Sequence, residues 1–236
     1  MNLTEIVAPS MKELFIEAIE NMILSGELKI GDKLPTEREM ADQMKVSRTI
    51  VNLGLNELQN KGFIEIIPRK GTYVADYIRK GRLETLLSII NHNGGNFDKK
   101  TFYSLMEFRI INEGAGAYLA ALNRTDSDIE LMEELYENML SEGSFEEISK
   151  VIFDFHHAVF CATGNYIYPL VHNAFENISI VLTSVMFKYF EVKETTDQIK
   201  IIIEKIKEKD AQGAKKAMEN LINRGIENLE KNYFSY

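Results

Sequence analysis

The sequence contains no tryptophan, only four prolines and a single cysteine among 236 residues. Because Cys161 has no second cysteine to pair with, an intrachain disulfide is excluded, which suits the reducing cytoplasm in which we expect the protein to act. No apolar run approaches the roughly 20 residues that a membrane-spanning helix needs, so we expect no membrane partner. Residues 1–10 also lack the basic start and apolar core of a signal peptide.

Basic residues are outnumbered by acidic ones, and the net charge of −9 argues at first against a nucleic-acid partner. The balance reverses locally, because residues 45–80 hold seven Lys and Arg side chains against three Asp and Glu, a net charge of +4. Phosphate binding requires only such a local cationic surface, which an acidic overall composition can hide. A short basic stretch also occurs on ordinary solvated faces, so this pattern needs support from the motifs around it.

Two helices are predicted at the start of the chain. Residues 11–24 show a broad apolar face of helical spacing, and Gly26 ends the pattern. After a turn-rich connection, Thr36 and Glu39 have the spacing of a capping box, which predicts that a second helix begins there.

A third helix and a hairpin follow. Ser47 can cap the helix, and its apolar side chains recur at positions that share one buried stripe: Val51, Leu55 and Leu58. Residues 63–67 and 72–75 are rich in aromatic and β-branched residues and predict two short strands joined by a tight turn. Three helices and a hairpin with a basic tip predict a winged helix-turn-helix.

This arrangement indicates which side chains reach DNA. Arg48, Thr49 and Asn52 lie off the buried stripe at the leading end of the third helix, behind its cap Ser47. Arginine can bind guanine through two hydrogen bonds, and asparagine can bind adenine in the same way. The side chains at the hairpin tip, Arg69 and Lys70, can reach phosphates or the adjacent minor groove.

The same segment resembles the GntR family of bacterial repressors. Its characteristic pieces occur in the family's order and spacing, at residues 34–38 (LPTER), 46–51 (VSRTIV), 62–64 (GFI) and 71–74 (GTYV). The resemblance implies a homodimer that binds a palindromic DNA operator. It also implies repression, because members of the family most often repress. It assigns DNA contacts to Arg38, Arg48, Asn52 and the residues around Gly71.

Two positions depart from the family pattern. The family most often has arginine where this chain has Asn52, which predicts an altered base preference or a weaker half-site. The family has alanine where this chain has Gly54. Glycine there costs about 1 kcal/mol of helix stability relative to alanine, and we expect close packing against a neighbouring helix to explain it.

The remaining chain predicts helices and no further strands. After a polar, basic linker at residues 76–82 and a break at residues 92–96, the apolar spacing predicts an antiparallel bundle. The expected helices span residues 83–91, 100–122, 127–140, 145–162, 166–190, 199–206 and 211–234. The stretch 166–190 is nearly continuous in apolar residues, so we expect it to be one central, buried helix.

This second half resembles the FadR-type C-terminal domain, also called the FCD domain. The resembling pieces lie at residues 106–121 (MEFR with Glu113 and AYLAA), 155–165 (FH with GN) and 209–218. The resemblance implies a bundle that dimerises and holds a small effector, often an organic acid, among its helices.

Many members of that branch also hold a metal, through an acid four residues before a histidine and two further histidines. Here only His156 remains, because the other three positions carry Ile152, Ile199 and Leu221. One imidazole cannot form a tetrahedral or octahedral site. We therefore expect no metal and no cofactor. We expect the effector site to be formed by five residues: Arg109, His156, Ile152, Ile199 and Leu221.

The roles of these residues stay open at this point. Arg109 either pairs with Glu113 one turn away or faces a cavity and binds an anionic effector. The aliphatic replacements either line an apolar cavity or fill the core, and His156 is either a hydrogen-bonded core residue or a ligand contact. If a cavity exists, a fatty or branched-chain acid, with one acid end and an apolar body, suits it.

We expect a mainly α protein with three parts: a winged helix-turn-helix in residues 1–76, a linker with a short helix in residues 77–99, and the effector-binding and dimerising bundle in residues 100–236. The leading prediction is a ligand-responsive regulator. An alternative is an effector-independent regulator whose bundle only dimerises. An enzyme with an accessory DNA-binding domain is disfavoured, because the chain has no Gly-rich phosphate loop or nucleophile constellation.

Overall fold

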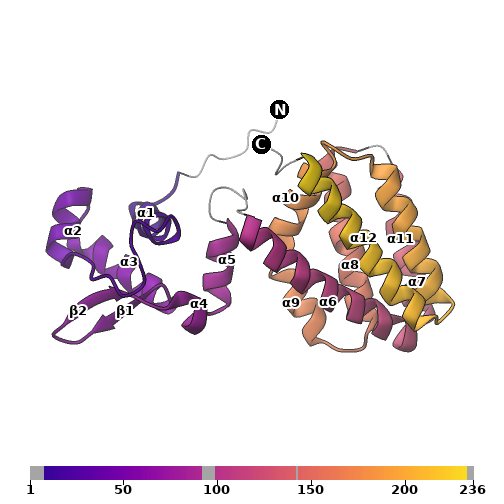
Figure 1. Ribbon diagram of the computed structural model, residues 1–236, viewed down its shortest axis with the longest axis horizontal. Coiled ribbons are helices and arrows are strands. Elements are labelled where there is room, and N and C mark those ends of the chain that lie inside the picture. The colour runs from indigo at the N-terminus through magenta and orange to yellow at the C-terminus, as the bar shows by residue number, and fades with distance from the viewer. Residues whose placement is uncertain (1–7, 92–98, 142, 233–236) are drawn as a thin grey trace. The chain divides into compact units, whose positions relative to one another are not determined.

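The computed structural model describes residues 8–91, 99–141 and 143–232. They divide into two compact units, within residues 1–94 and 95–236 (Figure 1). No helix in the described ranges is long and apolar enough to cross a membrane. The predicted break at residues 92–96 and the predicted helical end beyond residue 232 lie outside the described residues.

The first unit is a winged helix-turn-helix. Its elements are α1 (Met11–Leu24), α2 (Glu37–Met44), α3 (Arg48–Asn60), β1 (Ile64–Ile67), β2 (Gly71–Val74), α4 (Tyr77–Lys80) and α5 (Leu83–Asn91). The predicted capping box of α2 is confirmed, because the backbone N–H of Thr36 donates to Glu39 Oε2 at 2.8 Å and that of Glu39 donates to Thr36 Oγ1 at 3.3 Å. The side chain of Ser47 caps α3 by accepting from the backbone N–H of Ile50 at 3.2 Å.

A single hydrophobic core holds the first unit together. The predicted stripe of α3 is buried, with Val51 and Leu58 at 0% exposure and Leu55 at 1%. The α1 helix crosses α3 at Gly54, where an added Cβ would lie 2.3 Å from Cδ1 of Phe15. The expectation that Gly54 permits close helix packing is therefore confirmed.

Helices α4 and α5 belong to the first unit. Thr85 donates its hydroxyl to the backbone carbonyl of Lys61, and Ser88 Oγ donates to Glu20 Oε1 at 3.2 Å. Lys61 Nζ also binds Glu20 Oε1, at 2.9 Å. The segment predicted as a linker thus contains a short helix after Asp76 and a second helix fixed to the C-terminal end of α3.

The second unit is a helical bundle. Its helices are α6 (Lys99–Asn123), α7 (Asp126–Met139), α8 (Phe145–Ala162), α9 (Ile167–Asn173), α10 (Glu176–Met186), α11 (Val192–Lys207) and α12 (Ala211–Asn232). The long α6 packs against α12 and α8, as the ribbon shows (Figure 1). Glycine allows this approach, since a Cβ on Gly116 would lie 2.7 Å from the Phe160 ring.

The prediction of one buried helix over residues 166–190 is wrong. The chain forms α9 and α10 instead, because the N–H groups of Ala174 and Phe175 bond to carbonyls three residues back, those of Val171 and His172, and close α9 in a tight turn. Nor is the stretch central, since Tyr166 is 77% exposed and Leu170 is 63% exposed. Apolarity alone does not tell whether a helix face is covered.

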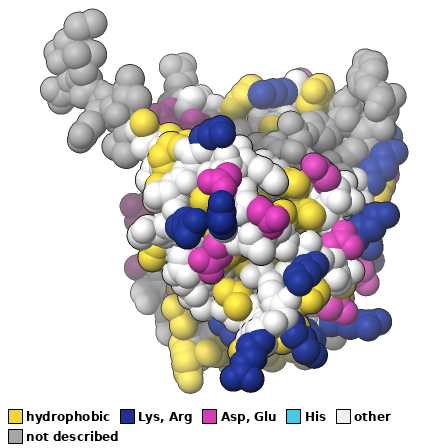
Figure 2. Space-filling view, turned by 90° about the vertical axis from the view of Figure 1, so that its left-hand side faces the viewer, with side chains coloured by type: hydrophobic (Ala, Val, Ile, Leu, Met, Phe, Trp, Pro, Cys, Tyr) yellow, Lys and Arg dark blue, Asp and Glu magenta, His cyan; other side chains and the backbone are white. Residues whose placement is uncertain are grey.

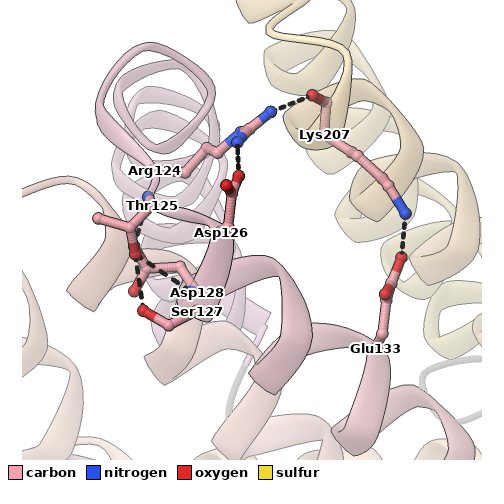
Figure 3. A network of polar contacts seen from close by, with 7 residues as sticks. All are labelled: Arg124, Thr125, Asp126, Ser127, Asp128, Glu133 and Lys207. Carbon is pink, nitrogen blue, oxygen red and sulfur yellow. Dashed lines mark hydrogen bonds and ion pairs between the residues drawn. The ribbon is translucent and has the colours of Figure 1, made fainter.

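A polar network joins three helices of the second unit (Figure 3). Arg124, just after α6, donates from Nη1 to Asp126 Oδ1 at 2.7 Å and from Nη2 to the backbone carbonyl of Lys207 at 2.6 Å. Lys207 Nζ in turn binds Glu133 Oε1 of α7 at 2.6 Å. Arg124 therefore ties the start of α7 to the end of α11.

Candidate DNA interface and effector cavity

The leading end of α3 has the geometry that base reading requires. The helix buries the stripe of Val51, Leu55 and Leu58, so its opposite face is free to meet a ligand. That face carries four of the predicted DNA contacts, all exposed: Ser47, Arg48, Thr49 and Asn52. Asn52 Oδ1 accepts a hydrogen bond from Asn56 Nδ2 at 3.1 Å, which orients the amide along the helix.

The hairpin tip carries two exposed cations. Lys70 N–H donates to the Ile67 carbonyl at 3.0 Å across a turn that Pro68 begins. Arg69 lies in the left-handed region with φ of 65°, as the third residue of a type II turn does. The wing thus presents the Arg69 and Lys70 side chains on a strained, tight loop.

Gly71 and Arg38 complete the predicted DNA set. Gly71 has a φ of 121°, and an added Cβ there would lie 2.8 Å from Cε of Lys33. Arg38 is exposed on α2, with its Nε 3.8 Å from Asp42 Oδ2. On the face of this unit shown in Figure 2, Lys and Arg side chains gather toward the lower edge, with Asp and Glu among the cations nearer the centre.

A buried carboxylate lies at the centre of the second unit. Glu113 on α6 is 4% exposed and pairs with Arg109, whose Nε is 2.5 Å from Oε1. Its other oxygen, Oε2, lies 2.8 Å from His156 Nδ1 on α8. That nitrogen is buried and has no hydrogen-bond partner among the described residues. The predicted ion pair of Arg109 with Glu113 is confirmed.

Opposing effects act on the pKa of Glu113. Burial alone would raise it, but the neighbouring Arg109 guanidinium and His156 ring outweigh burial and hold the pKa well below its ordinary value. Glu113 is therefore ionised at neutral pH and compensates the charge of Arg109.

A cavity of about 60 Å³ opens beside this cluster. Arg109, Ile152, His156 and Leu221, four of the five predicted effector residues, line it. The fifth, Ile199, is fully buried and is not among the residues that line the cavity. Sequence reasoning missed its other walls, which include Met106, Leu182, Thr183, Met186 and Thr195.

These residues do not fit a metal ion. Ile152 and Leu221 line the cavity with aliphatic side chains, which offer no ligand atoms. Within residues 8–91, 99–141 and 143–232, no three His, Cys, Asp or Glu side chains converge as metal ligands do. Whether the protein binds a metal in solution stays a prediction, which elemental analysis can test.

His172 is a functional candidate that the sequence did not reveal. It lies on α9, 8% exposed, stacked on Phe153 with ring centroids 4.2 Å apart and planes at 9°. Burial lowers its pKa to about 3, so the ring is neutral at pH 7. No spacing in the sequence joins His172 to His156, although their ring centroids are 6.4 Å apart.

The fold and these sites define a winged helix-turn-helix joined to a helical domain with an internal cavity. Residues 13–74 match the bacterial regulatory proteins of the gntR family, and residues 104–224 match the FCD domain. The chain therefore belongs to the gntR family and carries an FCD domain. The matching families and relatives are transcriptional regulators rather than enzymes.

Two individual relatives are likewise transcriptional regulators. The regulator LutR of Bacillus subtilis (strain 168) is 31% identical over 166 residues, which cover 70% of this chain and 72% of LutR. The Glc operon transcriptional activator of Escherichia coli (strain K12) is 30% identical over 161 residues, or 66% of this chain; the match spans 61% of the activator's length.

Among solved structures, Lar, which controls expression of the Listeria monocytogenes agr system, matches with a TM-score of 0.63. The match covers 96% of this chain and 99% of Lar at 17% identity, so it shows a shared fold.

Proposed function

We propose that this protein is a transcriptional regulator that binds a palindromic DNA operator as a homodimer in the cytoplasm and responds to a small acid. The observation that carries the proposal is the two-sided α3, whose stripe of Val51, Leu55 and Leu58 is buried while Ser47, Arg48, Thr49 and Asn52 stay exposed. A helix held in this way can enter the major groove with its N-terminal residues at the base edges.

The expected DNA contacts divide by role. Arg48 and Asn52 would read base edges, and Thr49 and Ser47 lie beside them at the start of the helix. Arg38, Arg69, Lys70 and the backbone at Gly71 would bind phosphate or the minor groove and so fix the position of α3. Repression rather than activation is the family's habit.

Selection from random DNA with the full chain tests this function. We expect enrichment of a palindrome whose half-sites are about one helical turn, roughly 34 Å, apart. Arg48→Ala should then weaken binding to the enriched sequence at least tenfold in fluorescence anisotropy, since each good base contact contributes about 1–3 kcal/mol. The control Lys200→Ala, at an exposed cation of the second unit, should leave the affinity unchanged. No enrichment above random DNA would exclude the proposal.

A second copy of the chain would supply the second recognition helix. Helix α9 and the preceding Tyr166 expose apolar side chains that a dimer could cover, with Tyr166 at 77%, Leu170 at 63% and Ile167 at 50% exposure. Light scattering after size exclusion should give twice the mass of the chain, and Leu170→Glu should shift it toward the monomer. A monomeric wild type that still binds the palindrome tightly would exclude the dimer.

The effector is expected in the 60 Å³ cavity lined by Arg109, Ile152, His156 and Leu221. The Arg109 guanidinium can bind an acid group while the aliphatic walls hold an apolar body. Small carboxylates such as acetate and propionate should raise the melting temperature in proportion to the logarithm of their concentration above Kd. Thr183→Leu, which fills this cavity, should abolish the shift; an unchanged melting temperature for every acid would favour a bundle that only dimerises.

A further inference from the structure

A short extended segment, residues 31–34, flanks the hairpin of the first unit. It lies antiparallel to β2, with Lys33 directly opposite Tyr73. The backbone N–H of Leu34 donates to the carbonyl of Thr72 at 2.9 Å and holds the segment in this register. Because β2 leads away from the hairpin turn, the antiparallel segment leads toward it.

The side chain of Lys33 follows the segment toward the turn. Opposite residues of an antiparallel pair share one face of the sheet, and so do residues two apart on one strand. Gly71 is therefore on the same face as Tyr73 but nearer the turn. A Cβ on Gly71 would lie 2.8 Å from Cε of Lys33 and 3.4 Å from its Nζ. The lysine stem thus occupies the space that a side chain at this position would fill.

The ring of Tyr73 supports the ammonium group. Lys33 Nζ lies 5.8 Å from the ring centroid, within the range of a cation–π contact. The Tyr73 hydroxyl donates to the backbone carbonyl of Lys70 at 3.3 Å, so the ring itself reaches the hairpin tip. Lys33 therefore brings a third cation to the end of the wing that carries Arg69 and Lys70.

The charge of Lys33 is not neutralised by the protein. Over the residues that the structure describes, Lys33 is exposed and forms no ion pair with a carboxylate. Other lysines of the first unit pair with glutamates; these are Lys12, Lys61 and Lys80. Like charges gathered at one place repel each other, and an anion that lies among them relieves the repulsion. The tip of the wing is thus arranged to meet an external anion.

We propose that Lys33 is a further DNA-positioning residue, which binds a backbone phosphate beside Arg69 and Lys70. The proposal rests on the DNA binding proposed above. A lysine meets a phosphate as a point charge, whatever base the phosphate carries, so Lys33 would fix the wing on the duplex without reading sequence. The sequence did not reveal this role, because only the pairing of residues 31–34 with β2 brings Lys33 to the wing.

The salt dependence of operator binding tests this role. Lys33→Gln keeps most of the stem and removes the charge. Because a dimer would lose two phosphate contacts, the slope of log affinity against log salt should fall by about 1.8, and binding at about 0.1 M salt should weaken at least fivefold. Lys33→Arg should retain the wild-type slope. The preferred bases should be the same in all three proteins, since a phosphate contact carries no sequence information.

Two controls separate phosphate binding from support of the wing. Lys29→Gln removes an exposed charge from the same connection, before the segment reaches the hairpin, and should leave the slope unchanged. Tyr73→Leu removes the ring and keeps the Lys33 charge, so it should retain the wild-type slope. If Lys33 only supported the wing, Lys33→Gln and Tyr73→Leu would weaken binding alike with no change of slope, which would overturn the proposal.

A measurement on the wild type needs no variant to fold. Operator DNA should slow acetylation of the Lys33 amine severalfold, measured by mass spectrometry, and leave acetylation of Lys29 unchanged. Equal acetylation of Lys33 with and without DNA would overturn the proposal. A wild type that binds the operator while Lys33→Gln keeps its slope would remove this inference alone, whereas a wild type that binds no DNA would remove the proposed function as well.

Discussion

Glu113 Oε2 lies 2.8 Å from His156 Nδ1, so one carboxylate of α6 serves both the arginine of its own helix and a histidine of α8. At 4% exposure it is screened little by water. Because it neutralises Arg109, it also determines how much positive charge an anionic effector meets. The charge balance of the effector cavity thus depends on a residue that is not among those lining it.

Glu113→Gln should destabilise the protein. Removing the carboxylate leaves Arg109 without its counter-ion, and we expect a loss of roughly 2–4 kcal/mol at pH 7, below the range for a fully buried pair because the Arg109 side chain keeps 22% exposure. Urea unfolding measures the change. Glu107→Gln, at an exposed position of the same helix, should change the unfolding free energy by less than about 0.5 kcal/mol.

The contribution of Glu113 to the stability of the protein should decrease at low pH. Its pKa is lowered in the folded state from the ordinary 4.5, so its stabilisation is complete above that value and is lost as pH falls below it. The difference between wild type and Glu113→Gln should therefore shrink below about pH 4.5. A difference that stays constant down to pH 3 would contradict the ionised, buried carboxylate.

His172 should make the stability fall at milder acidity. Its pKa drops from 6.5 to about 3 on folding, so between those values the unfolded chain binds a proton that the folded chain does not. The free energy of unfolding then decreases as pH falls. The decrease is up to about 1.36 kcal/mol per pH unit, reached when the unfolded chain binds one full proton more than the folded chain. In His172→Phe, which keeps the stack on Phe153, the slope between pH 5 and 6.5 should be smaller; equal slopes would contradict the neutral, buried ring.

Gly54→Ala should destabilise the first unit although alanine favours helix by about 1 kcal/mol. The added Cβ would meet Phe15 Cδ1 at 2.3 Å, and overpacking of this kind costs about 1–3 kcal/mol. Chemical denaturation gives the change directly. In a Phe15→Leu background the same substitution should cost less, and a cost that is equal in both backgrounds would mean that the two residues do not interact.

Arg69→Gly should separate stability from DNA binding. The left-handed backbone at Arg69 suits glycine, so the substitution should stabilise the protein by about 1 kcal/mol while lowering operator affinity. If Arg69 binds a phosphate, the slope of log affinity against log salt should also fall by about 1.8, because the dimer loses two phosphate contacts. Lys70→Gly removes the same charge without the backbone relief, so it should weaken binding but not stabilise; identical stability changes in the two variants would contradict the strain.

Much of the first unit follows from short-range rules. The caps at Thr36 and Ser47 act within one helical turn, and the buried stripe of α3 repeats every three or four residues. The packing of Gly54 could also be anticipated, because a glycine inside a helix needs a reason, but Phe15 as its partner could not. These features depend on neighbours along the chain, which a sequence displays directly.

The second unit depends more on contacts between distant segments. Arg109 and Glu113 could be paired from their spacing on one helix, whereas the contact of Glu113 with His156 and the position of His172 require the packing of α6, α8 and α9. Composition cannot place residues 166–190, because an exposed apolar face and a buried one have the same composition. Ile199 shares the aliphatic character of Ile152, but only its place in the core shows that it is away from the cavity wall.

The central claim is that the leading end of α3 reads base pairs, and comparing DNA preferences selected by the wild type, Asn52→Arg and Asn60→Arg tests it most directly. The same substitution is made on two exposed residues of one helix, near its start and at its end. We expect Asn52→Arg to change the preferred bases in each half-site, toward guanine at the contacted position, and Asn60→Arg to leave them unchanged. Indistinguishable preferences for the wild type and Asn52→Arg would contradict the account.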